Sequence, residues 1–185
     1  MNIFPQTISE LINYEAVYRT APATPSLLIT IKEKDIRVIT GYGPQEVWKS
    51  EDKMPFFLAL EEDIAKAEIA GKSVIIGFDA NSKLGPEWIK QDPHGQSQNG
   101  NILEGILQRH ALIVANGNPE KCSGAITRRR ATVDGVEVSA IYFIILSQDI
   151  ESAYVSLNID EEKKYSLTSC ARTVTKESDH NTLLC

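Results

Sequence analysis

A continuous run of mostly β-branched residues, Ser73-Val74-Ile75-Ile76-Gly77, lies near the middle of the chain. Neighbouring side chains of a strand point to opposite faces, so a run without polar alternation predicts a strand that is buried on both faces. Such a strand lies inside a sheet, with other layers packed against it on each side. The run therefore predicts the central strand of a layered fold.

The segments around this run predict the rest of the fold. Apolar residues three or four apart predict an amphipathic helix over 54–70, beginning at Pro55, ending before Gly71 and exposing its charged side chains. Two apolar runs around a polar turn at 32–35 predict a β-hairpin. A second helix is expected over 100–110, and residues 8–12 have a short helical pattern. Strands are expected at 27–31, 36–40, 112–115, 125–127, 137–146, 153–157 and 182–184, and a long loop at 81–99.

Composition limits the class of protein. The 185 residues are 42% hydrophobic, which is enough for one compact domain with a core. No apolar run approaches the roughly 20 residues of a membrane span, and the first ten residues lack a secretory signal. Cys122, Cys170 and Cys185 are widely spaced, which favours reduced thiols over disulfides or a zinc site. We therefore expect a soluble intracellular protein without a membrane partner, with nucleus and cytoplasm not distinguished.

The net charge of −6 does not suit a protein that coats nucleic acid by bulk electrostatics. A local basic patch can still bind a phosphate backbone. Charge therefore neither requires nor excludes a nucleic-acid substrate.

An Asp and an Asn follow the predicted central strand, in the sequence Gly77-Phe78-Asp79-Ala80-Asn81. Open sheets place their binding crevices at the carboxyl ends of such strands, and side chains two residues apart point to the same side. The Asp79 carboxylate can activate a water molecule, and the Asn81 amide can donate hydrogen bonds to an oxyanion. An Asx-rich turn that merely ends the strand is the alternative, and the pattern leaves both open.

Two further motifs lie at the ends of predicted strands, one before the last strand and one after the strand at 36–40. Ser178-Asp179-His180 comes directly before the last strand and offers a carboxylate and an imidazole for metal or phosphate contacts. Tyr42, in Gly41-Tyr42-Gly43-Pro44-Gln45, either projects into a cleft toward a phosphate oxygen or packs over its own turn. The other two histidines, His94 and His110, fit solvated or capping positions better than catalytic ones.

The order of these motifs is more specific than any one of them. It resembles the endonuclease/exonuclease/phosphatase superfamily, which includes DNase I, the abasic-site endonucleases and the endonuclease domains of LINE-type retrotransposons. The resemblance covers about residues 26–185 and is closest in style to the retroelement copies. It implies an α/β (α+β) fold, a four-layered sandwich of the DNase I-like type with a metal site between its two sheets. Residues 1–25 form a divergent segment in front of this domain.

The resemblance also implies roles for individual residues. Asp79 would activate the attacking water, Asn81 would stabilise the phosphorane, and Tyr42 would bind the scissile phosphate. Asp179 would contact the metal and His180 the phosphate. The expected activity is Mg²⁺- or Mn²⁺-dependent hydrolysis of a phosphodiester, with DNA as the expected partner. Arg128, Arg129 and Arg130 are candidates for contacts with the phosphate backbone, although a solvated turn explains them equally well.

Two departures from the family pattern weaken the prediction of activity. Tyr142 stands where the family has an Asp that orients the catalytic His, and by strand alternation Glu137 faces away from it. The Asn and the metal-binding Glu that precede the Tyr-Gly-Pro segment have no counterpart; Glu10 and Glu15 lie in a helix-like stretch and are taken as surface residues. The chain thus looks truncated at its N-terminus, with an incomplete first sheet and weak metal binding.

Two hypotheses follow. The chain is either an impaired metal-dependent DNA endonuclease or an inactive remnant of the fold that binds nucleic acid or protein.

Overall fold

The structure is a computed structural model, and it describes residues 12–17, 26–31, 34–162, 168–171, 174–177, 179 and 181–184. Two α-helices, α1 (Ser50–Ile69) and α2 (Gln98–Arg109), pack on a six-stranded sheet with the order β1-β2-β3-β4-β9-β5. Its strands are β1 (Ile12–Val17), β2 (Ser26–Ile31), β3 (Lys34–Tyr42), β4 (Ser73–Asp79), β5 (Leu112–Val114) and β9 (Tyr142–Ser147).

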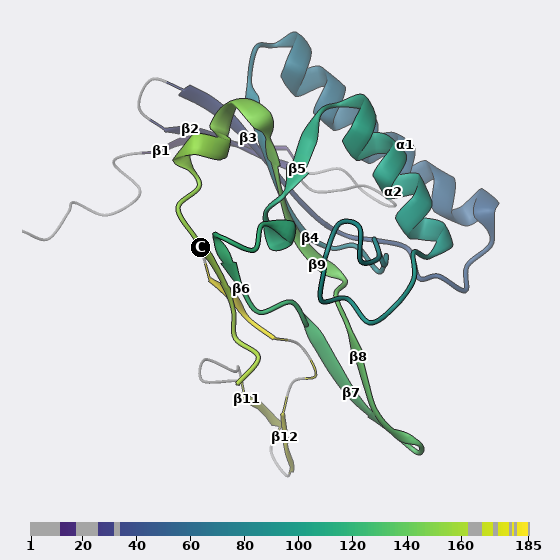
Figure 1. Cartoon of the computed structure of the whole chain (residues 1–185). Helices are drawn as coiled ribbons and strands as arrows, with labels where there is room; N and C mark the ends of the chain where they lie inside the picture. Colours follow the sequence, from purple (N-terminus) through teal and green to yellow (C-terminus); the bar gives the residue numbers. More distant parts are fainter. Residues whose placement is uncertain are drawn as a thin grey trace, which may run out of the picture.

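Smaller sheets complete the described structure. A three-stranded sheet has the order β13-β10-β6, and two hairpins, β7–β8 and β11–β12, extend from the body (Figure 1). Their bounds are β6 Cys122–Ser123, β7 Arg128–Thr132, β8 Gly135–Ser139, β10 Leu157–Ile159, β11 Thr168–Ala171, β12 Val174–Glu177 and β13 Leu183–Leu184. Two 3₁₀ helices, η2 (Ala115–Gly117) and η3 (Gln148–Ala153), follow β5 and β9.

The strand over the β-branched run is central, as predicted. β4 pairs in parallel with β3 and antiparallel with β9, so it is an interior strand of the large sheet. Its side chains alternate between two cores: Val74 and Ile76 pack with the helices, and Ile75 packs against the cluster around Leu146 and Leu157. Burial on both faces explains why this strand has no polar alternation.

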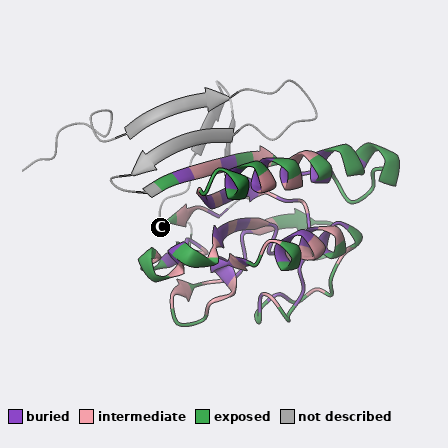
Figure 2. Cartoon of the chain, turned by 90° about the horizontal axis from the view of Figure 1, so that it is seen from above, coloured by how far each residue is buried: buried purple, intermediate pink, exposed green. Residues whose placement is uncertain are grey.

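The two cores define an α/β sandwich. The helices α1 and α2 cover one face of the large sheet, each with a stripe of buried residues (Figure 1 and Figure 2). On the opposite face, η3 and the sheet that contains β10 contribute Ile150 and Leu157 to the second core. A helical layer, the six-stranded sheet and the three-stranded sheet therefore stack in that order within the described residues. Neither described helix is long and apolar enough to cross a membrane.

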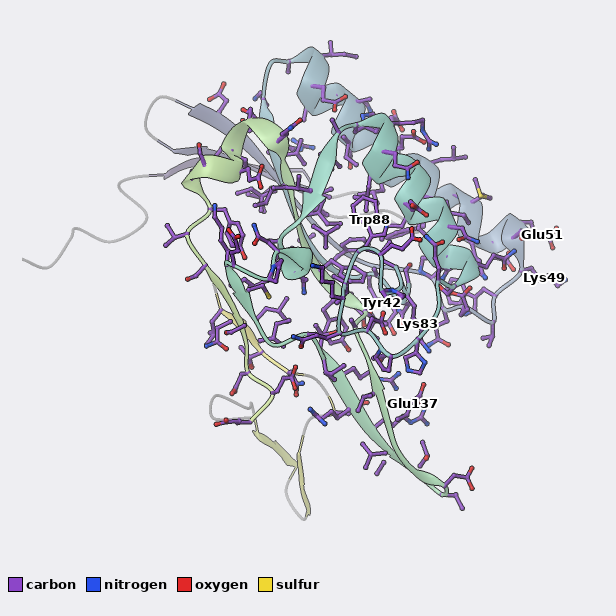
Figure 3. All side chains as sticks on the ribbon, viewed as in Figure 1. Tyr42, Lys49, Glu51, Lys83, Trp88 and Glu137 are labelled. Carbon is purple, nitrogen blue, oxygen red and sulfur yellow. The ribbon has the colours of Figure 1, made fainter. Side chains whose placement is uncertain are left out.

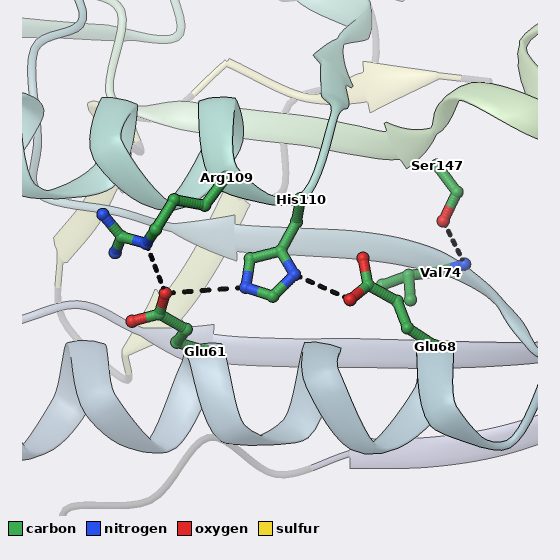
Figure 4. Close-up of polar contacts among 6 residues, drawn as sticks. All are labelled: Glu61, Glu68, Val74, Arg109, His110 and Ser147. Carbon is green, nitrogen blue, oxygen red and sulfur yellow. Dashed lines mark hydrogen bonds and ion pairs between the residues drawn. The ribbon is translucent and has the colours of Figure 1, made fainter.

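Polar contacts between α1 and the end of α2 hold the helical layer together (Figure 4). The Glu61 carboxylate accepts a hydrogen bond from Arg109 Nε at 2.6 Å, and this contact with the guanidinium lowers the pKa of Glu61. His110 caps α2 and bridges to Glu68 through Nδ1 at 2.8 Å. His110 therefore has the capping place that was expected of it.

The predicted hairpin of β2 and β3 is confirmed, with Ser26 opposite Ile39. The predicted start of the first helix is wrong, because α1 begins at Ser50 and contains Pro55. The Lys49 carbonyl accepts from the backbone N–H of Asp52 and of Lys53, and this turn starts the helix earlier. Within the predicted helix the expectation that charges face solvent fails at Asp63, which is buried; Lys53, in the turn added before it, is buried as well.

Several strand predictions are wrong. Residues 125–127 are not a strand, and the strand there begins at Arg128; the predicted strand at 153–157 is displaced to β10 because η3 extends to Ala153. The helix expected near residue 12 is wrong where it is described, since Glu15 lies on β1 opposite Leu28. Strand pairing with β2 overrides the local helical pattern. The boundary between 1–25 and 26–185 stays a prediction.

Candidate active site

Three residues that are distant in sequence form a row across the large sheet. Tyr42 at the end of β3 pairs with Asp79 at the end of β4, and Asp79 pairs with Tyr142 at the start of β9. Directly paired residues of neighbouring strands have side chains on the same face. That face is the one opposite the helices, because Ile75 and Ile144 share it in the second core.

A pocket of about 470 Å³ opens over this row. It contains most of the side chains expected at a site: Tyr42, Asp79, Asn81, Arg128, Arg130, Tyr142 and Asp179. Tyr42 is 62% exposed and lines the pocket, so it does not simply pack over its own turn. The fold therefore brings together residues from five separate segments of the chain.

The turn after β3 packs tightly on the end of β4. Gly43 N donates to the Asp79 carbonyl at 2.6 Å, and a Cβ at position 43 would lie 2.3 Å from the Ala80 carbonyl oxygen. Asn81 has a left-handed backbone with φ of 44° and donates from its side-chain amide to the Gly43 carbonyl at 2.9 Å. Asn81 N also donates to Asp79 Oδ1 at 3.0 Å. The predicted Asx turn is therefore present, and it forms part of the pocket.

A buried amide beneath the pocket connects the two turns. Asn99 Nδ2 donates to the Pro44 carbonyl at 2.8 Å and to the Asn81 carbonyl at 3.3 Å. The backbone N–H of Asn99, in the first turn of α2, donates to the Glu46 carboxylate at 3.0 Å. The buried Lys53 ammonium donates to the Glu46 carbonyl at 2.6 Å. Both helices thus fix the loop that carries one wall of the pocket.

The long loop predicted at 81–99 is confirmed up to the start of α2, and its two ends are closed on each other. Lys83 N and Gly100 N both donate to Ser97 Oγ at 3.1 Å, so Ser97 caps α2 and ties down Lys83. Lys83 and Ser97 both line the pocket, and Figure 3 shows Lys83 near Tyr42. Lys83 was not predicted as a site residue, although its place four residues after Asp79 was a usable signal.

Asp179 is held against β7 by backbone and side-chain contacts. The Asp179 carbonyl accepts from Arg129 N at 2.7 Å, and its carboxylate accepts from Arg128 Nε at 3.2 Å. The next described residue, Asn181, donates from its backbone to the Thr127 carbonyl at 2.8 Å. His180, which lies between them in sequence, is outside the described residues.

The three consecutive arginines have different environments. Alternation along β7 directs Arg128 and Arg130 to the pocket, whereas Arg129 Nη2 donates to Glu161 at 2.8 Å. The Glu161 carboxylate also accepts from Ala125 N and Ile126 N. Burial by itself would raise the pKa of Glu161, but these donors outweigh it and the pKa is lowered. Arg129 therefore stabilises the fold beside the pocket through its contact with Glu161.

Solved structures provide the comparison for this arrangement. The endonuclease domain of TRAS1, a telomere-specific non-LTR retrotransposon, has a TM-score of 0.64 and 18% identity over 93% of this chain and 67% of that domain. The 3′-5′ exonuclease NExo from Neisseria meningitidis has a TM-score of 0.63 and 15% identity over 92% of this chain and 69% of that one. This chain has the endonuclease/exonuclease/phosphatase fold, of the DNase I-like type.

Two more structures with the endonuclease/exonuclease/phosphatase fold contain a bound ligand. The 3′ phosphatase NExo from Neisseria, bound to a product DNA hairpin, has a TM-score of 0.57 and 17% identity, covering 85% of this chain and 62% of that chain. Beta toxin from Staphylococcus aureus, with bound magnesium ions, has a TM-score of 0.50 and 14% identity, covering 87% and 56%. No protein-family model and no curated protein sequence matches the chain.

The described residues do not fit a divalent ion held by the protein. Among them, no group of three or more His, Cys, Asp or Glu side chains converges on a common point. Asp179, the expected ligand, is already paired with the Arg128 guanidinium. This donor set differs from the metal centre that the endonuclease/exonuclease/phosphatase resemblance implies.

The position of Glu137 differs from the prediction. Glu137 lines the same pocket as Tyr142, although alternation along one strand placed them on opposite faces. Figure 3 labels Glu137 on the β7–β8 hairpin. The prediction is wrong because the expected strand at 137–146 is two strands: β8 ends at Ser139, and β9 begins at Tyr142. Alternation does not continue through the two intervening residues. This fold therefore provides a carboxylate in the pocket that the sequence pattern concealed.

Proposed function

We propose that the chain is a phosphodiester hydrolase acting on nucleic acid, with the Asp79 pocket as its active site. The proposal rests on one observation: Tyr42, Asp79, Asn81 and Asp179 line a single pocket at the carboxyl end of β4. In an open sheet this is where ligands bind. The basic side chains of Lys83, Arg128 and Arg130 in the same lining suit an anionic substrate.

The chemistry follows from the side chains of the row and the turn. Asp79 accepts a proton from a water molecule whose oxygen attacks phosphorus. The ester P–O bond breaks, and the departing oxygen takes a proton from solvent. Tyr42 donates a hydrogen bond to a phosphate oxygen, and so does the Asn81 N–H that the Gly43 carbonyl does not use.

DNA is the proposed substrate because two of the similar proteins act on or bind nucleic acid. One is a retrotransposon endonuclease domain, and the other is bound to a DNA hairpin. An intracellular location belongs to the same proposal. Magnesium or manganese enters the proposal as a variable of the assay, since beta toxin contains bound magnesium.

Nicking of supercoiled plasmid and cleavage of a duplex with an abasic site test the proposal. Each substrate is incubated with Mg²⁺, Mn²⁺ or EDTA. Asp79→Asn keeps the size of the side chain and removes its basic carboxylate, so it should lower the rate by about a hundredfold or more. Asp134→Asn, at the exposed tip of the β7–β8 hairpin, is the matched control. Equal rates for wild type and Asp79→Asn would show that any activity comes from elsewhere.

Binding of nucleic acid without cleavage is a second candidate function. Two observations favour it: Asp179 is paired with Arg128, and Tyr142 takes the place beside Asp79 where the family resemblance implies a carboxylate. Under this hypothesis the wild type and Asp79→Asn bind DNA equally well and neither nicks it.

A further inference from the structure

We propose that Arg128 supplies the positive charge that the family resemblance assigns to a divalent cation at Asp179, so that the pocket binds a nucleic-acid phosphodiester without a metal ion. This inference rests on the proposed function, because it concerns the same pocket and the same class of ligand. The proposed function concerns hydrolysis, whereas this inference concerns binding, which can be measured without any chemical step.

The first observation is the position of the guanidinium. Arg128 Nε lies 3.2 Å from Asp179 Oδ2, and the two side chains are 25% and 38% exposed. A guanidinium has five N–H donors in one plane, and the Nε contact uses one of them. Its Nη groups have no hydrogen-bond partner within the described part of the chain, and the residue lines the pocket. Arg128 can therefore bind Asp179 and a phosphate oxygen together, and paired N–H donors match phosphate geometry.

The second observation is that the backbone fixes both partners. Arg129 N donates to the Asp179 carbonyl at 2.7 Å, which aligns the two segments next to the ion pair. Asn181 donates from its side chain to the Ile126 carbonyl at 2.5 Å. Thr127 Oγ1 accepts from Tyr142 N at 3.1 Å, which joins this segment to the row in the large sheet. The guanidinium is thus held in place before a ligand arrives, so less entropy is lost on binding.

The third observation is the balance of charge in the lining. Its cations are Lys83, Arg128 and Arg130, and its carboxylates are Glu46, Asp79, Glu137 and Asp179. The Glu46 carboxylate accepts from Asn99 N in the first turn of α2, where the helix dipole favours a negative charge. The Asp179 carboxylate is compensated by Arg128. A divalent ion at Asp179 would have to displace this guanidinium or approach it closely, and the repulsion between the two cations opposes metal binding there.

Fluorescence anisotropy with a labelled short DNA duplex tests the inference, in EDTA and in Mg²⁺ at equal ionic strength. The wild-type Kd in EDTA should be within about twofold of its value in Mg²⁺. Arg128→Gln should weaken binding in EDTA by about tenfold or more. It should also reduce the slope of log Kd against log salt by about 1. Arg109→Gln, at the far end of α2 from Ser97, removes the same charge outside the pocket and should change neither quantity.

A second variant guards against misfolding. Arg128→Lys keeps the positive charge but loses the planar set of donors, so its Kd should lie between those of wild type and Arg128→Gln. Far-UV circular dichroism and urea midpoints establish that each variant is folded. If Arg128→Gln does not fold, the Kd of Arg128→Lys is compared with that of Arg109→Lys. Equal Kd values for these two variants overturn the inference.

The outcomes separate this inference from the proposed function. Wild-type binding that appears only with Mg²⁺ overturns the role of Arg128 and leaves hydrolysis intact. Arg128→Gln and Arg109→Gln binding equally well would also overturn it. Binding in EDTA that depends on Arg128, without nicking under any condition, contradicts the hydrolase proposal alone.

Discussion

Tyr142 on β9 lies directly opposite Asp79 on β4, and both side chains line the same pocket. Burial raises the pKa of Tyr142, and the negative charge of Asp79 raises it further, against the opposing effect of Arg128. The Tyr142 hydroxyl is therefore protonated at neutral pH. The pair thus consists of one neutral donor and one carboxylate, not of two like charges.

This pairing predicts the effect of placing a carboxylate at position 142. Tyr142→Asp puts two negative charges directly opposite each other, so it should lower the free energy of unfolding by about 1 to 3 kcal/mol. Tyr142→Phe keeps the ring and should stay within about 1 kcal/mol of wild type. Urea denaturation at pH 7 measures both. The nicking rate of Tyr142→Asp should not exceed that of wild type; robust Mg²⁺-dependent turnover would show that the N-terminal part of the chain supplies the missing metal ligand.

The turn after β3 predicts a strong requirement for glycine at position 43. The Cβ of Gly43→Ala would lie 2.3 Å from the Ala80 carbonyl oxygen, and this backbone atom cannot move without shifting Asp79 and Asn81. We expect a loss of about 1 to 3 kcal/mol in stability, together with weaker DNA binding. Gly95→Ala is the control, since nothing lies within 4 Å of its Cβ. Thermal unfolding compares the two, and equal midpoints would contradict this packing.

The shape of the pocket should also depend on the buried side-chain amide of Asn99. Asn99→Ala removes the donors to the Pro44 and Asn81 carbonyls and should cost about 1 to 3 kcal/mol. Asn101→Ala, an exposed residue of the same helix, should have little effect. Urea midpoints give the difference. Anisotropy then shows whether DNA binding weakens in Asn99→Ala alone, and no change in either measurement would mean that the bridge between the turns is unimportant.

Glu161 should contribute to the loss of folding stability at acidic pH. Its pKa is lowered in the folded chain, so its contacts stabilise the fold fully above the unfolded pKa of about 4.3. This stability is lost as the pH falls through the folded pKa. The wild-type chain should therefore lose free energy of unfolding as the pH falls below about 4.3, and Glu161→Gln should lose less of it over the same range. Urea denaturation over a pH series, with the exposed Glu120→Gln as control, measures the change. Parallel pH profiles for the two variants would rule out this role for Glu161.

Short-range sequence patterns predicted the central strand and the buried face of the first helix. The β-branched run fixed β4 as a central strand, and the apolar spacing placed Leu60 and Ile64 in the core. The positions of Tyr42 and Asp79 at strand ends were also predicted. The structure adds that β3 and β4 are parallel neighbours, so these two ends lie at the same edge of the sheet. Patterns were less reliable at boundaries, where contacts with distant segments decide.

The sequence alone determined the ordered motifs, the central strand and the resemblance to one fold, since these depend on side-chain chemistry and short-range periodicity. Tertiary structure decided which of these residues meet. The break between β8 and β9 places Glu137 in the pocket, and alternation on β7 separates Arg128 from Arg129. The pairing of Arg128 with Asp179 joins residues 51 positions apart, a contact that depends on chain packing and has no local signal. Packing therefore decided which charged side chains lie together in the pocket.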